Sequence, residues 1–189
     1  MTVPEDLTED APELVAQDGV AVPDRLRRLW APHRLAYIKD EAVVGGASDE
    51  CPFCRIPTLP DREGLVVARR ELAYAVLNLH PYNPGHLMVV PYRHVADLEA
   101  LTRDEAFEVL HLTQQAIRAV RAASRPQGFN VGLNLGGVAG GSLAAHLHQH
   151  VVPRWGGDAN FITVLAQTKV IPQLLADTRD LLAEHWPAD

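Results

Sequence analysis

Residues 146–150 read His146-Leu147-His148-Gln149-His150. Successive side chains of a β-strand point to opposite faces, so histidines two residues apart project from the same side. Histidine is a nucleophile, a general acid or base and a metal ligand near neutral pH. Three imidazoles on one face of a predicted strand over 146–153 therefore indicate a functional site.

Two kinds of chemistry compete for these histidines. A single histidine on a strand is usually a half-buried structural residue, but three of them, approached by the glycine-rich segment 136–142, favour function. One functional interpretation is nucleophilic catalysis. The other is a zinc ion bound by His146, His148 and a third ligand from elsewhere in the chain. The residues alone leave both interpretations open.

A second candidate site is the pair Cys51 and Cys54. Two thiolates at this spacing can bind one zinc ion from a tight turn, but they supply only half of a tetrahedral ligand set. His94 and His146 are the natural candidates for the missing ligands. A redox pair would need a thioredoxin-like strand-to-helix context, which the surrounding sequence lacks. The structural alternative is a pair of buried thiols.

Composition narrows the class of protein. The 189 residues are 47% hydrophobic and 22% charged, as in a soluble globular domain. The net charge of −7, with no basic stripe, argues against a nucleic-acid partner. No stretch approaches the ~18 apolar residues of a membrane span, and the acidic amino terminus is unlike a secretory signal. Two cysteines without a signal are expected to stay reduced, so we expect a cytoplasmic protein without a membrane partner.

The chain divides into an arm and one domain. Residues 1–22 carry six acidic side chains and neither Lys nor Arg. This composition predicts a flexible acidic arm, or one that orders only against a partner subunit. Residues 23–189 are expected to form a single domain of ordinary core size. Within it, the basic and aromatic segment 25–38 predicts a short helix and a packing turn.

The hydrophobic pattern predicts an α+β fold. A helical period runs over 103–123, and Thr102 with Glu105 three residues later forms a capping box at its start. The tail predicts a second helix over 170–185, with Pro172 in its first turn. Runs typical of strands lie at 64–68, 72–79, 86–90, 129–135 and 146–153. Because no regular βαβ alternation is present, we expect an antiparallel sheet of about five strands rather than a doubly wound sheet.

A third candidate site is the segment 77–86, which joins two of the predicted strands. Its Pro, Asn and Gly content is typical of a turn, and this alone is a sufficient structural explanation. The functional interpretation is that Asn78, at the end of a strand, donates to and accepts from the diol of a sugar.

These segments resemble the histidine triad (HIT) superfamily. The run over 141–154 resembles the motif that names it, and 78–94 resembles its nucleotide-site strand pair. With 51–54 and 27–38, the resemblance covers about residues 25–185. Within the superfamily the chain is most similar to bacterial diadenosine tetraphosphate phosphorylases, also called ATP adenylyltransferases. Their tail after the triad, Pro-Arg-Trp and then Asp-x-Asn-Phe, is matched at 153–161.

The resemblance implies a HIT-like fold and an enzyme that cleaves diadenosine tetraphosphate with inorganic phosphate, giving ATP and ADP. His148 would attack an α-phosphorus and form a covalent AMP-histidine, which divides one displacement into two easier ones. His150 would contact the same phosphate and offset charge as it develops. This chemistry requires no catalytic cofactor.

The resemblance also implies how substrate binds. Asn78 would bind the adenosine ribose. Asn134 and the glycine loop with Ser142 would hold the leaving polyphosphate and then the incoming phosphate, since exposed backbone N–H groups bind anions. The candidate substrate-binding residues are Asn78, Asn134, Gly141, Ser142, Gln149 and Arg154.

The zinc question becomes more specific with the resemblance. Family members with an equivalent Cys-x-x-Cys place a structural zinc between the two cysteines, a later histidine and the first triad histidine. These ligands correspond to Cys51, Cys54, His94 and His146, which leaves His148 for catalysis. The resemblance further implies a homo-oligomer, in which dimers pair through a helix and an edge strand and the acidic arm extends the assembly to a tetramer.

Two motif positions point to different activities. Many transferase members replace the third triad histidine by glutamine, whereas this chain keeps His150, as hydrolytic members do. Hydrolytic members commonly place glutamine where this chain has Ser142. A small side chain there leaves room for inorganic phosphate, so we predict phosphorolysis. A HIT hydrolase or nucleoside phosphoramidase, a non-catalytic nucleotide-binding regulatory protein and a three-histidine metalloenzyme remain as alternatives.

Overall fold

The computed structural model describes residues 51–139, 143–158 and 171–188. The predicted acidic arm, the segment 25–38 and the loop residues Gly141 and Ser142 lie outside these ranges. Within them, none of the helices combines the length and the apolar character that crossing a membrane requires.

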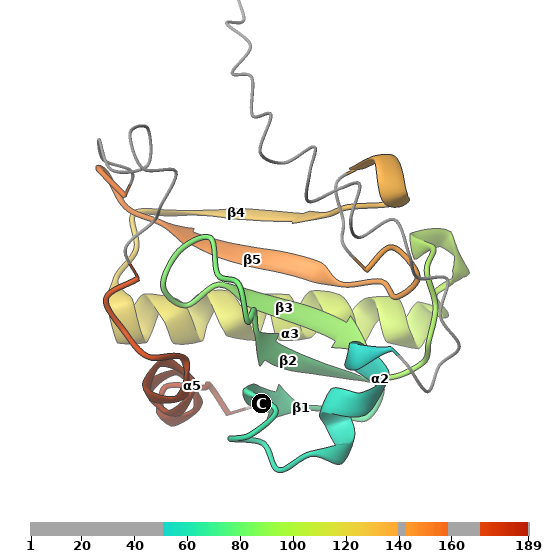
Figure 1. The fold of residues 1–189 in the computed structure, drawn as a ribbon, viewed down its shortest axis with the longest axis horizontal. Coiled ribbons are helices and arrows are strands. Elements are labelled where there is room, and N and C mark those ends of the chain that lie inside the picture. The colour runs from blue at the N-terminus through green and yellow to red at the C-terminus, as the bar shows by residue number, and fades with distance from the viewer. Residues whose placement is uncertain (1–50, 140–142, 159–170, 189) are drawn as a thin grey trace, which may run out of the picture.

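A five-stranded antiparallel sheet forms the centre of the molecule (Figure 1). The strand order is β1-β2-β3-β5-β4, so the last strand along the chain lies between β3 and β4. This confirms the predicted antiparallel α+β fold with five strands. The strands are β1 (Val66–Arg69), β2 (Ala73–Leu77), β3 (Leu87–Pro91), β4 (Gly128–Leu133) and β5 (Gln149–Arg154).

The long helix α3 (Arg103–Ser124) packs along one face of the sheet (Figure 1). The predicted capping box is present, because Thr102 Oγ1 accepts from Glu105 N and Glu105 Oε2 accepts from Thr102 N. Val109, Leu112 and other apolar residues of one stripe are buried against β2, β3 and β5. The helix ends at Ser124, and the following residue, Arg125, caps it in a left-handed conformation with φ of 48°.

On the opposite face of the sheet, a short turn of helix covers β1, β2 and β3. α2 (Pro52–Arg55) and the 3-10 turn η2 (Ile56–Thr58) pack there, and Phe53 joins a core cluster with residues of β1, β2 and β3. Both β2 and β3 are therefore buried along their whole length, since alternate residues face α3 and α2.

The C-terminal helix α5 (Leu175–Glu184) packs against β1 and α3. The prediction that it begins at about 170 with Pro172 in its first turn is wrong, because 171–174 precede the helix. The described residues also include the 3-10 turns η3 (Leu98–Ala100) and η4 (Gly137–Ala139).

The prediction that all three histidines lie on one strand is also wrong. β5 begins at Gln149, after a turn over 143–145, so His146 and His148 precede it. The backbone N–H of Leu147 donates to the carbonyl of Val95, 2.6 Å away, rather than to a neighbouring strand. The three rings nevertheless gather in one region, because this segment runs directly into β5.

Candidate active site and metal centre

His148 is held with its proton on Nδ1. That nitrogen lies 2.8 Å from the backbone carbonyl oxygen of His146, which can only accept a hydrogen bond. Nε2 of the neutral ring therefore keeps its lone pair. The ring is buried, and burial lowers the pKa of His148 below its ordinary value, so the neutral form predominates near pH 7. A neutral imidazole with a free Nε2 lone pair is the form that a histidine nucleophile requires.

His150 is oriented by His86, a residue that the sequence analysis did not select. The backbone N–H of Tyr82 donates to His86 Nδ1 at 3.1 Å, so the proton of a neutral His86 lies on Nε2. His86 Nε2 then donates to His150 Nδ1 at 3.0 Å. His150 must consequently carry its own proton on Nε2, which lies 3.5 Å from Asn134 Nδ2. That proton meets an acceptor when the Asn134 amide is turned so that Oδ1 faces the ring. This relay turns an N–H donor of His150 outward.

Both rings of the relay are uncharged. Burial is the main cause that lowers the pKa of His86 to about 3, and the repulsion that protonated His150 and His148 would exert adds to it. Burial and His148 lower the pKa of His150 to about 4. The centroids of His148 and His150 are 5.0 Å apart, so a neutral nucleophile and a neutral donor lie side by side.

Nothing in the spacing of the sequence singles out His86. It reaches the triad because the turn before β3 brings it beside β5.

A second cluster brings two thiols and two imidazoles together. The ligand atoms of Cys51, Cys54, His94 and His146 all lie within 4.8 Å of one another. His146 Nδ1 is 3.3 Å from Cys51 Sγ and 3.5 Å from Cys54 Sγ, and His94 Nδ1 is 3.3 Å from Cys54 Sγ. The four predicted ligands thus converge from α2, the segment after β3 and the segment before β5.

The donor set fits a tetrahedral zinc ion. Two thiolates and two imidazoles form a ligand set that structural zinc sites use. His146 Nε2 lies 2.9 Å from the carbonyl of Pro91, which accepts its proton and leaves Nδ1 directed at the thiols. A hydrogen bond to the second ring nitrogen is what orients histidine ligands in metal sites.

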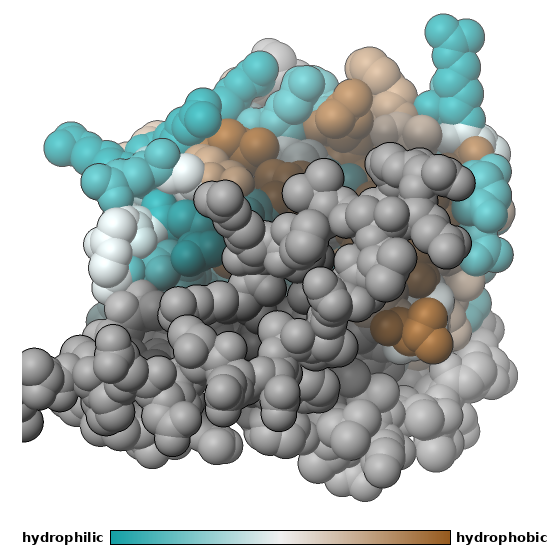
Figure 2. All heavy atoms as spheres, turned by 90° about the horizontal axis from the view of Figure 1, so that it is seen from above, coloured by the Kyte–Doolittle hydropathy of each residue, from teal (hydrophilic) through white to brown (hydrophobic). Residues whose placement is uncertain are grey.

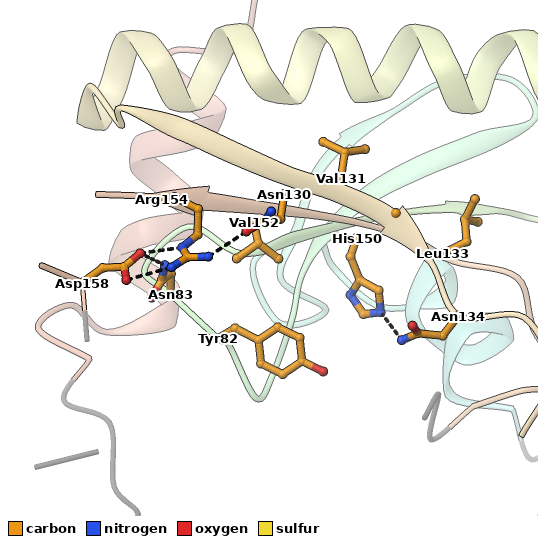
Figure 3. A pocket seen from close by; sticks show the side chains of 11 residues that line it. Tyr82, Asn83, Asn130, Val131, Leu133, Asn134, His150, Val152, Arg154 and Asp158 are labelled. Carbon is orange, nitrogen blue, oxygen red and sulfur yellow. Dashed lines mark hydrogen bonds and ion pairs between the residues drawn. The ribbon is translucent and has the colours of Figure 1, made fainter. Parts of the chain in front are cut away.

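A groove of about 510 Å³ opens beside His150 (Figure 3). Its floor is formed by β4 and β5, and the turn before β3 forms a wall. His150 and Asn134 lie at one end, and the ion pair of Arg154 with Asp158 lies at the other. The lining residues are Tyr82, Asn83, Asn130, Val131, Gly132, Leu133, Asn134, His150, Val152, Arg154 and Asp158.

With this geometry in place, comparison with known proteins identifies the family. The model of the HIT domain matches residues 60–157. The chain belongs to the HIT domain family. The resemblance expected from the triad motif is thereby confirmed, and so is the HIT-like fold.

One relative matches nearly the whole chain, and another matches about half of it. A protein named AP-4-A phosphorylase from Mycobacterium tuberculosis (strain ATCC 25618 / H37Rv) is 60% identical over 188 residues, and the match covers 96% of each chain. A bis(5'-nucleosyl)-tetraphosphatase (asymmetrical) from Schizosaccharomyces pombe is 38% identical over 96 residues, which are 49% of this chain and 50% of that one.

A solved structure of another HIT protein has a similar fold. It is a Zn-bound histidine triad family protein from Mycobacterium smegmatis, with a TM-score of 0.59 and 26% identity. The match covers 74% of this chain and 94% of that one.

Two of the predicted substrate-binding residues line the groove of this HIT domain with His150. These two residues are Asn134 and Arg154. The Arg154 guanidinium donates to Asp158 Oδ2 at 2.6 Å and to Asn130 Oδ1 at 2.8 Å. The hydrogen bonds from Arg154 hold the pKa of Asp158 well below its usual range. The guanidinium charge is therefore already matched by a carboxylate. Asn83, which the sequence analysis missed, also donates to Asp158.

Two other predicted residues, Gln149 and Asn78, are not brought together with His150. Gln149 Nε2 donates to Thr113 Oγ1 of α3 at 2.9 Å, which places its side chain on the opposite face of the sheet. Asn78 Oδ1 accepts from the backbone N–H of His80 in the turn after β2, and Asn78 does not line the groove. Gly141 and Ser142 lie outside the described residues.

Proposed function

We propose that this chain cleaves diadenosine tetraphosphate with inorganic phosphate and releases ATP and ADP. The observation that carries the proposal is the hydrogen bond from His148 Nδ1 to the His146 carbonyl, which leaves Nε2 available for attack. The near full-length relative named AP-4-A phosphorylase supports the substrate.

The reaction takes two steps at phosphorus. In the first, His148 Nε2 forms a bond to an α-phosphorus, and the bond from that phosphorus to the bridging oxygen breaks, so that ATP leaves. In the second, an oxygen of inorganic phosphate attacks the same phosphorus, the P–N bond breaks, and ADP leaves. The outward N–H of His150 donates to a phosphoryl oxygen in both steps, where negative charge develops.

The proposed substrate contacts follow the groove and the neighbouring loop. Asn134, beside His150, would bind a phosphoryl oxygen, and Gly141 with Ser142 would hold the leaving polyphosphate and then inorganic phosphate. Asn78 would bind the ribose, and Arg154 would contact substrate at the far end of the groove. The contact of Gln149 with Thr113 favours a role in holding β5 on α3 over a role in binding substrate.

We propose a structural zinc at Cys51, Cys54, His94 and His146. The convergence of the four ligand atoms and the zinc in the related M. smegmatis protein support it. Bound there, the ion would cross-link α2 to the segments that flank β3 and β5. No step of the reaction requires it, so His146 is structural and His148 catalytic.

We also propose a cytoplasmic homo-oligomer with an acidic arm over 1–22 and a single domain over 23–189. β4 is an edge strand, and such strands offer unpaired backbone groups to a second chain. Exposed apolar side chains lie on it and on α3, including Val131, Phe107 and Leu110. Figure 2 views the molecule from the β4 side, and the coloured part of that face shows hydrophobic residues among hydrophilic ones. A dimer through α3 and β4 would cover these residues.

The test is product analysis with and without inorganic phosphate. Diadenosine tetraphosphate should be consumed only when phosphate is present, giving equal amounts of ATP and ADP. Release of AMP without phosphate would instead support the alternative of a HIT hydrolase. The S. pombe relative named as a tetraphosphatase is the reason to test for it. Intact mass after an alkaline quench should show the chain with one added AMP, because a phosphoramidate is labile in acid. Tight nucleotide binding without turnover would favour a regulatory protein.

A further inference from the structure

Phe53 stands between the metal centre and the nucleophile. It lies in the turn between Cys51 and Cys54, and its ring is buried. The ring contacts His146 edge-on, with centroids 5.6 Å apart, and His148 at 4.9 Å with a tilt of 46°. One aromatic side chain therefore packs against a metal ligand and against the proposed nucleophile.

The turn that carries Phe53 is itself fixed. Tyr74 of β2 is fully buried, and its hydroxyl donates to the carbonyl of Phe53 at 2.7 Å. The backbone N–H of Cys54 donates to the carbonyl of Cys51, which closes the turn. Phe53 is thus held both by the sheet beneath it and by the two cysteines that flank it.

His146 makes a second connection between the same two sites. Its ring faces the thiols through Nδ1, and its backbone carbonyl accepts the proton of His148 Nδ1. The carbonyl sets which nitrogen of His148 carries the proton. The ring of Phe53 blocks one side of the imidazole and so limits rotation of that ring about its χ2 bond.

We propose that Phe53 is a positioning residue for His148, and that the Cys-x-x-Cys turn aims the nucleophile as well as supplying thiolates. This inference rests on the proposed function, in which His148 Nε2 attacks phosphorus in line. An in-line attack tolerates little error, since a displacement of 1 Å can cost about 100-fold in rate. Without the ring of Phe53, the imidazole samples orientations in which the hydrogen bond to the His146 carbonyl is broken.

The experiment compares Phe53→Leu with Val90→Ala in the full-length, zinc-loaded protein. Val90 lies in the same core cluster and is fully buried, so its truncation loosens the same packing. Phe53→Leu should lower kcat by roughly 10- to 100-fold with KM within about twofold of the parent. Val90→Ala should lower kcat less than threefold, and both variants should keep the zinc content of the parent.

Nitrogen NMR of labelled histidine gives a readout that does not involve substrate. The parent and Val90→Ala should show a single His148 tautomer with the proton on Nδ1, whereas Phe53→Leu should show a mixture. If Phe53→Leu keeps the single tautomer, or loses no more kcat than Val90→Ala, the proposal is overturned. A parent without turnover of diadenosine tetraphosphate would remove the proposed function, while the tautomer comparison would still decide the positioning role.

A second variant keeps the test decisive if Phe53→Leu does not fold. Tyr74→Phe preserves the shape of the core and removes only the hydrogen bond to the Phe53 carbonyl. It should lower kcat about 3- to 10-fold, again with little change in KM, and should broaden the His148 signals. Unchanged kcat together with an unchanged His148 spectrum would overturn the proposal.

Discussion

Replacing His86 tests the proton relay that orients His150. In His86→Phe the volume of the ring is kept, but Tyr82 N–H loses its acceptor and His150 Nδ1 loses its donor. His150 is then free to move its proton to Nδ1. Its Nε2 would present a lone pair, instead of an N–H, to the phosphoryl oxygen.

The magnitude follows from the hydrogen bonds that are lost. A hydrogen bond to a charged group contributes about 1.5–3 kcal/mol. If this bond is made to the transition state, its loss lowers kcat by roughly 10- to 100-fold. The unfolding free energy should fall as well, by about 1–3 kcal/mol for each buried polar group left without a partner.

The assay measures phosphate-dependent ATP release by the parent, His86→Phe and His86→Gln. The Gln side chain places an amide nitrogen near the position of His86 Nε2, so it can still donate to His150. We expect His86→Gln to keep most of the activity that His86→Phe loses. Equal kcat in the two variants, or a loss of less than threefold in His86→Phe, would refute the relay.

Four further predictions follow from the same structure. Because the pKa values of His86 and His150 lie at about 3 and about 4, the unfolded chain binds more protons than the folded one below pH 6.5. The stability due to these neutral rings is present above pH 6.5 and is lost as the pH falls toward 4. The urea midpoint of unfolding should therefore fall over that range, and it should fall less steeply in His86→Phe. A urea midpoint that does not change with pH would contradict this prediction. His148→Ala should lower kcat at least ~100-fold and abolish the AMP adduct, while the variant still binds nucleotide. An AMP adduct on this variant would exclude His148 as the nucleophile. Cys51→Ser should lower both the zinc content and Tm, and equal metal in variant and parent would disprove the site. Glu105→Gln should lower the unfolding free energy by about 1–3 kcal/mol, since Glu105 completes the capping box and accepts two hydrogen bonds from Arg93. A denaturant unfolding curve that matches the parent would contradict this prediction.

Several features of the site could be predicted from local sequence. The histidine spacing over 146–150 and the Cys-x-x-Cys turn are patterns in which chemistry and spacing coincide, so the triad, the HIT family and the four metal-ligand candidates could be named beforehand. The start of α3 could be named as well, because Thr102 and Glu105 satisfy each other's backbone groups within one turn of helix. The alternation rule was less successful: it placed His146 and His148 on β5, which begins only at Gln149.

The amino-acid sequence alone determined which chemical groups this protein carries and which elements form around them, because capping, hydrophobic period and motif spacing act over a few neighbouring residues. Only the tertiary structure decided which groups meet. Pairing of β3 with β5 brings His86 to His150, and packing of α2 on the sheet brings Phe53 to His148. The tertiary structure also turns the Gln149 side chain toward α3 and pairs Arg154 with Asp158. Each of these contacts depends on the order of the strands and on the face of the sheet that a side chain occupies. Residues adjacent in the chain set neither the strand order nor the face.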